Sequence, residues 1–204
     1  MTLSEFDNEV RKDYNIVCGC DEAGRGPLAG DVFAAAVVFD KDTVIEGIND
    51  SKKLTAKKRE ELFDEIMEKA VDFSIQTATV AEIEEINILN AAMLSMKRAV
   101  EDMDIKPDVC LIDGNKTPEG LACPAIAVVK GDAKSQAVAA ASILAKVARD
   151  RYMEQMAELY PEYQFEKHKG YGTKLHYQMI DRFGPCEIHR MSFLKKYYAK
   201  KNGK

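Results

Sequence analysis

The hydrophobic pattern of the chain contains short apolar segments that have the length and flanking turn residues of β-strands. They cover residues 14–20, 31–39, 72–79, 109–112 and 125–129. About ten residues separate the first two segments, which is too few for a crossover helix, so we expect these two to pair antiparallel.

Elsewhere, apolar residues recur at three- and four-residue steps, the periodicity of amphipathic helices. The predicted helices cover residues 56–70, 84–103, 135–160, 174–182 and 193–201. Met93, Met96 and Met103 share one stripe of the second helix, which we interpret as core packing rather than a cofactor site. The start of the third helix is rich in alanine, which indicates close packing against a sheet.

Strands that alternate with helices require parallel crossover connections, whereas the first two strands form a hairpin. The pattern therefore predicts an α/β fold, a mixed sheet flanked by helices. The length of 204 residues fits one domain, 1–204, with residues 161–204 as a C-terminal helical extension.

The composition is that of a globular protein, with 46% hydrophobic and 31% charged residues. No apolar run approaches the roughly 20 residues that span a bilayer, and the N-terminal segment lacks the apolar core of a signal peptide. We therefore expect a cytoplasmic monomer without membrane contact, whose five cysteines are free thiols.

The net charge of −5 does not indicate a nucleic-acid binder, but positive charge is concentrated locally. Basic runs lie within residues 52–59, 167–174 and 195–204. Each run alone is most often a solvated surface, yet a local patch can still contact phosphates.

Two carboxylates and three glycines stand together in the segment DEAGRGPLAG, residues 21–30. Gly24 and Gly26 match a loose dinucleotide-binding pattern, which requires a helix directly after the glycines. Pro27 and a β-rich segment follow instead, so the pattern fails, and the GK[ST] of a phosphate-binding loop is absent. A plain hairpin turn stays open, but it does not explain the adjacent acids.

Acidic residues follow three of the predicted strands. Asp21 and Glu22 follow the first strand, Asp113 ends the fourth, and Asp132 comes three residues after the fifth. A single acid in such a place is most often a turn residue or a helix N-cap, a role that Asp132 fits best. Functional groups gather at the carboxyl ends of strands in sheets with parallel crossovers, so we expect all four acids to share a site.

Carboxylates that lie close together repel one another in a low dielectric, and a hard divalent cation relieves this repulsion. Oxygen ligands favour Mg²⁺ or Mn²⁺, and the sequence offers no Cys/His set for zinc. Adjacent strand residues point to opposite faces, so Asp21 and Glu22 can share a site only if the strand bends or ends there. Gly19 and Gly24 lead us to expect such a bend.

Taken together, these segments resemble type 2 ribonuclease H, the bacterial ribonuclease HII family. The resemblance extends over residues 14–193. It is carried by CDEAGRGPLAG, NDSKKLTAKKRE, LIDGN, VKGDAKSQAVAAASILAKVARDR, HKGYGT and HRMSF. It implies a ribonuclease H-like fold, which has a five-stranded mixed sheet, helices on both faces and a helical C-terminal segment.

The resemblance also implies an endoribonuclease that hydrolyses the RNA strand of RNA–DNA hybrids. Such an enzyme cuts 5′ to single ribonucleotides embedded in duplex DNA and leaves 3′-hydroxyl and 5′-phosphate ends. The family's metal ligands fall on Asp21, Glu22, Asp113 and Asp132, which would hold two Mg²⁺ or Mn²⁺ ions during catalysis.

Substrate contacts follow from the same resemblance. It assigns Gly24, Arg25 and Gly26 to sensing the ribose 2′-hydroxyl through the backbone. It assigns Tyr171 to packing on the neighbouring deoxyribose, although an isolated tyrosine between glycines is otherwise more often a loop anchor. The phosphate contacts that it implies are Ser51, Lys52 and Lys53.

Two other functional classes stay open at this point. A binding module that holds nucleic acid or metal without cutting does not explain acids at all four positions, and a small-molecule phosphatase does not need the glycine turn. We interpret His168, His176 and His189 as structural or surface residues. For the lysine-rich tail, DNA binding, contact with a replication clamp and fraying all stay open.

Overall fold

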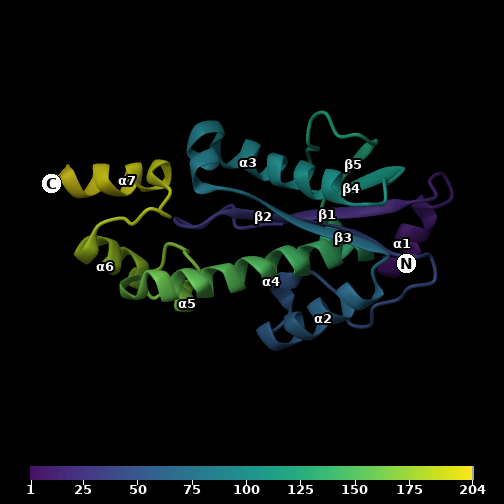
Figure 1. The fold of residues 1–204 in the computed structure, drawn as a ribbon, viewed down its shortest axis with the longest axis horizontal. Helices are drawn as coiled ribbons and strands as arrows, with labels where there is room; N and C mark the ends of the chain where they lie inside the picture. The colour runs from purple at the N-terminus through teal and green to yellow at the C-terminus, as the bar shows by residue number, and fades with distance from the viewer. Residues whose placement is uncertain (204) are drawn as a thin grey trace.

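The computed structural model describes residues 1–203 of the chain, without the side chains of Lys52 and Asn202. At its centre lies a five-stranded sheet with the order β3-β2-β1-β4-β5 (Figure 1). The strands are β1 (Val17–Ala23), β2 (Val32–Val38), β3 (Asp72–Ala78), β4 (Val109–Asp113) and β5 (Ala125–Val128). β1 and β2 pair antiparallel, as do β2 and β3, whereas β4 is parallel to both β1 and β5. The predicted hairpin opening and the mixed sheet are confirmed.

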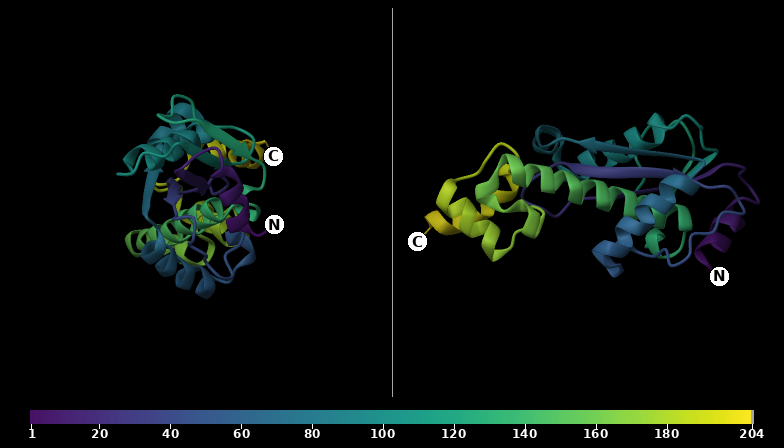
Figure 2. Two further views of the ribbon diagram at one scale, coloured as in Figure 1. Left: turned by 90° about the vertical axis from the view of Figure 1, so that its right-hand side faces the viewer. Right: turned by 60° about the horizontal axis from the view of Figure 1, so that its bottom comes forward.

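Helices cover both faces of this sheet, α3 on one side and α4 with α2 on the other (Figures 1 and 2). The helices are α1 (Leu3–Val10), α2 (Ala56–Lys69), α3 (Val80–Asp102), α4 (Gln136–Leu159), α5 (Phe165–His168), α6 (Lys174–Phe183) and α7 (Met191–Asn202). Short 3₁₀ turns are η1 (Ser51–Lys53), η2 (Gly131–Ala133) and η3 (Pro161–Tyr163). Within residues 1–203, no helix is long and apolar enough to cross a membrane.

The element boundaries differ from the predicted ones where capping side chains decide them. Thr79 and Glu82 form a capping box, so α3 starts at residue 80 rather than near residue 84. A second capping box, from Thr2 and Glu5, starts α1, which the hydrophobic pattern did not predict. Asn87, at φ +67°, interrupts α3, and its side chain accepts the amides of Leu89 and Asn90 at 3.0 and 3.2 Å.

Helix α4 lies unusually close to the central strand. A Cβ atom on Gly19 of β1 would lie 2.2 Å from the backbone of Ala137 and Val138, so only glycine fits there. The alanines of the first turns of α4 are fully buried against β1 and β2. Gly19 thus serves the approach of the helix, a role that the sequence analysis did not assign to it.

The opposite face of the sheet carries the methionine stripe of α3. Met96, Val100 and Met103 are buried against Cys18 and Cys110, which confirms the core interpretation. All five cysteines are free, as expected, and Cys18, Cys20 and Cys110 are buried in this cluster.

The segment from α5 to α7 packs beyond the end of the sheet, next to the loop between β1 and β2 (Figure 1). Backbone hydrogen bonds join the two segments: the amides of Leu28 and Gly30 donate to the carbonyls of Gly170 and Ile188, both at 2.8 Å. The β1–β2 loop is thus held between the sheet and the C-terminal segment.

Candidate active site

Asp21 lies near the carboxyl end of β1, beside the end of β4. Because Cys20 pairs with Ile112 in the parallel register, Asp21 and Asp113 are the next residues on neighbouring strands. Asp21 is only 5% exposed and lies beside Ser142 of α4. Burial raises the pKa of its carboxyl well above the ordinary value, and the charges of Glu22 and Asp113 raise it further. The Ser142 hydroxyl and the Glu22 amide, which donates at 2.7 Å, oppose this rise.

Asp113 connects the end of β4 to the turn that contains Asp132. Its carboxylate accepts a hydrogen bond from the Gly131 amide at 2.6 Å, and Asp132 is the next residue, buried in η2. Asp132 does not cap α4, because Ser135 occupies the N-cap and accepts the amide of Val138. The ordinary helix-cap role that Asp132 fits best is therefore excluded.

Glu22 lies one residue before the end of β1 and lines two hollows. β1 stays paired with β2 up to Ala23 and ends there, one residue after Glu22, so the condition that the strand bends or ends at this point is met by its ending. The Glu22 carboxylate accepts a hydrogen bond from Arg25 at 3.1 Å. It lines a hollow that it shares with Asp113 of β4 and with Leu89 and Met93 of α3.

Among the described residues, no three Asp, Glu, His or Cys side chains are grouped tightly enough to enclose a metal ion. Asp21, Glu22 and Asp113 each accept a hydrogen bond from a neighbouring donor, and carboxylates without a counter-ion repel one another. Their oxygen atoms are nevertheless the donors that Mg²⁺ and Mn²⁺ prefer, and a cation beside Asp21 and Asp113 would relieve the repulsion that raises the pKa of Asp21. The carboxylate oxygens therefore fit such a cation. To bind it, Asp21, Glu22 and Asp113 would have to rotate away from their present hydrogen-bond donors.

A hollow of about 200 Å³ opens beside Glu22. Its lining residues are Glu22, Ala23, Gly24, Arg25, Gly26, Ser51, Ser142, Lys146 and Tyr171. The structure thus brings the glycine turn, Ser51 and Tyr171 together from three distant parts of the sequence. A Cβ atom on Gly26 would lie 3.6 Å from the Tyr171 ring, so the turn and the ring are neighbours.

Of the three predicted phosphate contacts, only Ser51 lines the hollow. Ser51 is buried, and its hydroxyl lies 2.9 Å from that of Ser142. Lys53 is exposed and is not among the residues that line the hollow, and the side chain of Lys52 lies outside the described residues. The phosphate role of all three stays a prediction.

Two lining residues, Ser142 and Lys146, were not predicted from the sequence. They lie four residues apart on α4, which places both on the helix face toward the hollow. Lys146 also donates to Asp150 at 2.6 Å, and burial lowers the pKa of its ammonium group. The only feature of the sequence that could have indicated Ser142 and Lys146 was their four-residue spacing, as two polar residues within an alanine-rich helix.

The three histidines are buried and structural. His168 and His176 stack at 4.3 Å between ring centroids, and the Nε2 atoms of His176 and His189 lie 3.0 Å apart. His176 contacts the carbonyl of Tyr171 through Nδ1 at 3.0 Å, so the cluster supports the turn that presents Tyr171.

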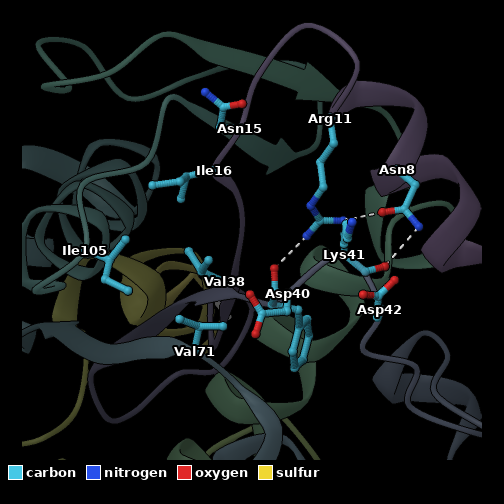
Figure 3. Close-up of a pocket in the computed structure, with 11 residues that line it drawn as sticks. Asn8, Arg11, Asn15, Ile16, Val38, Asp40, Lys41, Asp42, Val71 and Ile105 are labelled. Carbon is cyan, nitrogen blue, oxygen red and sulfur yellow. Dashed lines mark hydrogen bonds between the residues drawn. The ribbon is translucent and has the colours of Figure 1, made fainter.

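A larger hollow, of about 650 Å³, lies at the opposite end of the sheet (Figure 3). Arg11 crosses it and donates to Asn8 at 3.0 Å and to the carbonyl of Phe39 at 2.8 Å. Its acids, Asp40 and Asp42, are exposed. No predicted site residue lines this hollow.

Comparison with known proteins separates the open functional classes. The sequence profile described as ribonuclease HII matches residues 18–196. A ribonuclease HII of Caldicellulosiruptor saccharolyticus is 55% identical over 189 residues, which cover 93% of this chain and 92% of the relative. The chain belongs to the ribonuclease HII family. The recognised resemblance is confirmed, and the chain is a metal-dependent endoribonuclease of the ribonuclease H type.

Solved structures of related proteins support the same assignment. The crystal structure of ribonuclease H2 from Pyrococcus horikoshii matches with a TM-score of 0.72 and 30% identity, over 87% of this chain and 93% of that one. Ribonuclease HII from Archaeoglobus fulgidus, solved in a complex with PCNA, matches with a TM-score of 0.68 and 26% identity, over 86% and 94% of the two chains. The ribonuclease H-like fold is confirmed.

Proposed function

We propose that this endoribonuclease hydrolyses the RNA strand of RNA–DNA hybrids and cuts 5′ to single ribonucleotides embedded in duplex DNA. The observation that carries the proposal is the buried Asp21 carboxylate, next to Asp113 and beside the hollow that the glycine turn and Tyr171 line. A phosphatase for small molecules has no use for a tyrosine exposed at the rim of such a hollow, whereas a nuclease that reads a sugar beside the cut does.

Asp21, Glu22, Asp113 and Asp132 would hold two divalent ions. When bound, such ions activate the attacking water and stabilise the leaving 3′ oxygen, so that 3′-hydroxyl and 5′-phosphate ends result. The contribution of the chain is to hold these carboxylates at adjoining strand ends and to keep Asp21 out of water. No side chain has to act as the nucleophile.

Selection of a ribose requires a group that contacts its 2′-hydroxyl. In the Gly24–Gly26 turn, backbone groups border the hollow, and the two glycines carry no side chain of their own. The aromatic ring of Tyr171, 44% exposed, lies beside Gly26 and is available to pack on the next sugar. Together they form a reader for an RNA-to-DNA junction.

The test uses three substrates side by side: a DNA duplex with one ribonucleotide, a long RNA–DNA hybrid and an all-DNA duplex. With Mg²⁺ or Mn²⁺ we expect cleavage of the first two and none of the third. The 5′ position of the cut is mapped on a sequencing gel. Cleavage that persists in excess EDTA would reject the metal-dependent mechanism.

We also propose that the chain works as a monomer and that its lysine-rich C-terminal helix contacts a replication clamp. The support for the clamp is the complex of the archaeal relative with PCNA. Lys195, Lys196 and Lys200 lie on α7. Replacing all three with glutamate should abolish binding to the sliding clamp in surface plasmon resonance, with the melting temperature unchanged.

A further inference from the structure

The guanidinium group of Arg190 lies fully buried beneath the glycine turn. It makes five hydrogen bonds to four carbonyl oxygens of the β1–β2 loop. These run to Gly24 at 2.7 Å, Arg25 at 3.1 Å, Pro27 at 2.9 Å and Gly30 at 2.6 and 2.8 Å. All five N–H donors of an arginine are thereby directed into one loop.

These bonds fix the direction of the turn's amides. In a trans peptide, the N–H group points away from the carbonyl of the preceding residue. Because the carbonyls of Gly24 and Arg25 face Arg190, the amides of Arg25 and Gly26 face away from it. Arg190 therefore determines where these two amide donors point.

A second buried arginine, Arg149 of α4, reaches the same loop from the helix. It donates to the carbonyls of Ala29 at 3.1 Å and Asp31 at 3.3 Å. It also donates to the carbonyl of Lys169 at 3.0 Å, two residues before Tyr171. Arg149 thus links the loop of the glycine turn to the turn of the tyrosine.

Gly24 rests directly on this second arginine. A Cβ atom on Gly24 would lie 2.2 Å from Nε of Arg149, and its φ of +103° also favours glycine. Two adjacent buried cations are costly: burial, and after it the charge of Arg149, lower the pKa of Arg190 to about 9. Among the ion pairs of residues 1–203, none involves Arg149 or Arg190, and both guanidinium groups donate to backbone carbonyls.

We propose that Arg149 and Arg190 are positioning residues that hold the Gly24–Gly26 turn and the Tyr171 turn in a fixed relation, and so set the preference for an RNA–DNA junction. This inference rests on the proposed function of the site. The arginines do not touch the substrate; they act through the turns.

The test compares Arg190→Lys and Arg149→Lys with the matched control Arg11→Lys. Lysine keeps the charge but cannot reach several carbonyls at fixed angles as the planar guanidinium does. Arg11 likewise donates to a backbone carbonyl, that of Phe39, but at the far end of the sheet (Figure 3). The backbone bonds of Leu28 and Gly30 to the C-terminal segment do not involve either arginine side chain, so we expect them to hold the loop in every variant.

For each variant, kcat and KM are measured on the single-ribonucleotide duplex and on the long hybrid, together with Mn²⁺ affinity and the melting temperature. We expect both site variants to lose at least about tenfold more kcat on the junction than on the hybrid, equivalent to about 1.4 kcal/mol. KM and Mn²⁺ affinity should stay within about twofold, because phosphate contacts and carboxylates are untouched. Arg11→Lys should leave kcat and KM unchanged on both substrates.

Equal losses on both substrates would overturn the inference, because they would indicate a general structural role. A variant that melts below the assay temperature would indicate the same general structural role for that arginine. The inference would then be tested on the variant of the other arginine. If the wild-type enzyme does not cut the junction at all, the proposed function fails. If the wild type cuts it and the variants keep the same substrate ratio, only this inference fails.

Discussion

The two ends of the sheet each carry a hollow with acids and an arginine, yet they differ in how the charges are held. At the far end, Asp40 and Asp42 are exposed and Arg11 satisfies neighbouring polar groups in a hollow of about 650 Å³ (Figure 3). At the other end the hollow is smaller, about 200 Å³, but a buried carboxylate lies beside it. Cavity size therefore does not locate the chemistry.

The difference is one of stored electrostatic free energy. An exposed carboxylate costs almost nothing, whereas a buried one next to two others is destabilising unless a counter-charge binds. The raised pKa of Asp21 records this cost. A fold keeps such an arrangement where a bound cation or substrate offsets it.

The largest expected effect is at Asp21. Asp21→Asn should reduce activity at least about a thousandfold, the loss of about 4 kcal/mol of transition-state stabilisation. The same change should raise the melting temperature by about 2–4 °C per kcal/mol of relieved repulsion. Steady-state cleavage and calorimetry measure both.

The control for this change is Asp40→Asn, which should alter neither quantity. Asp132→Asn should also lose most activity and stay folded, because Ser135 and not Asp132 caps α4. If Asp21→Asn kept its activity, the buried carboxylate would matter no more for cleavage than the exposed acids at the far end of the sheet.

Tyr171→Ala should have the next largest effect. We expect junction cleavage to fall about 10- to 100-fold, because the ring packs beside Gly26 rather than on a metal ligand. Mn²⁺ affinity, measured by calorimetry, should not change. Phe183→Ala is a matched control, since Phe183 is 45% exposed in the same C-terminal segment. Equal effects of Tyr171→Ala and Phe183→Ala would show that Tyr171 has no specific role in recognising the RNA-to-DNA junction.

Acidification should affect the Tyr171 turn through the histidine cluster that contacts it. Burial lowers the pKa of His176 and of His189 to about 4, so their stabilising contribution is complete above pH 6.5. It is lost as the pH falls from about 6.5 to about 4, on the order of 3 kcal/mol per histidine. Asp7 and Asp21, with raised pKa, act in the opposite sense.

NMR titration of the histidine ring signals separates the effect of His176 and His189 on pH-dependent stability from the effect of the carboxylates. The His176 and His189 rings should stay neutral down to about pH 4, and amides of the Tyr171 turn should then exchange before those near Arg11. Titration of these rings near pH 6.5 would contradict the buried geometry.

The smallest effect is expected at Arg11. Arg11→Gln removes hydrogen bonds to Asn8 and Phe39 on a solvated surface, so unfolding free energy should fall by about 1 kcal/mol or less. Urea denaturation measures this loss. A larger loss, or any loss of cleavage, would show that the far hollow matters more than its exposed charges indicate.

Much of this architecture could be predicted because it depends on local pattern. Apolar segments that end in acids located β1, β4 and their carboxylates, and helical spacing located the core face of α3. The capping box of Thr2 and Glu5 was readable as well, although the hydrophobic pattern did not call for a helix there.

The rest depends on contacts between distant residues. Arg190 bonds to carbonyls 160 to 166 positions earlier in the chain, and a carbonyl looks the same in every residue, so no sequence pattern predicts the contact. The sequence likewise left open whether β1 bends or ends beside Glu22. Whether a strand bends is decided by its neighbours, and β2 keeps β1 extended to Ala23.

The hydrogen atom that Gly19 carries in place of a methyl group sets the distance between the sheet and α4. That helix carries Ser142, Lys146 and Arg149, so their depth relative to the strand ends is set roughly one to three helical turns away from them. A methyl group at position 19 would push α4 away from the sheet and displace Ser142, Lys146 and Arg149 together, although residue 19 does not line the hollow beside Glu22. Inactive variants at this glycine would thus report a displaced scaffold rather than lost chemistry.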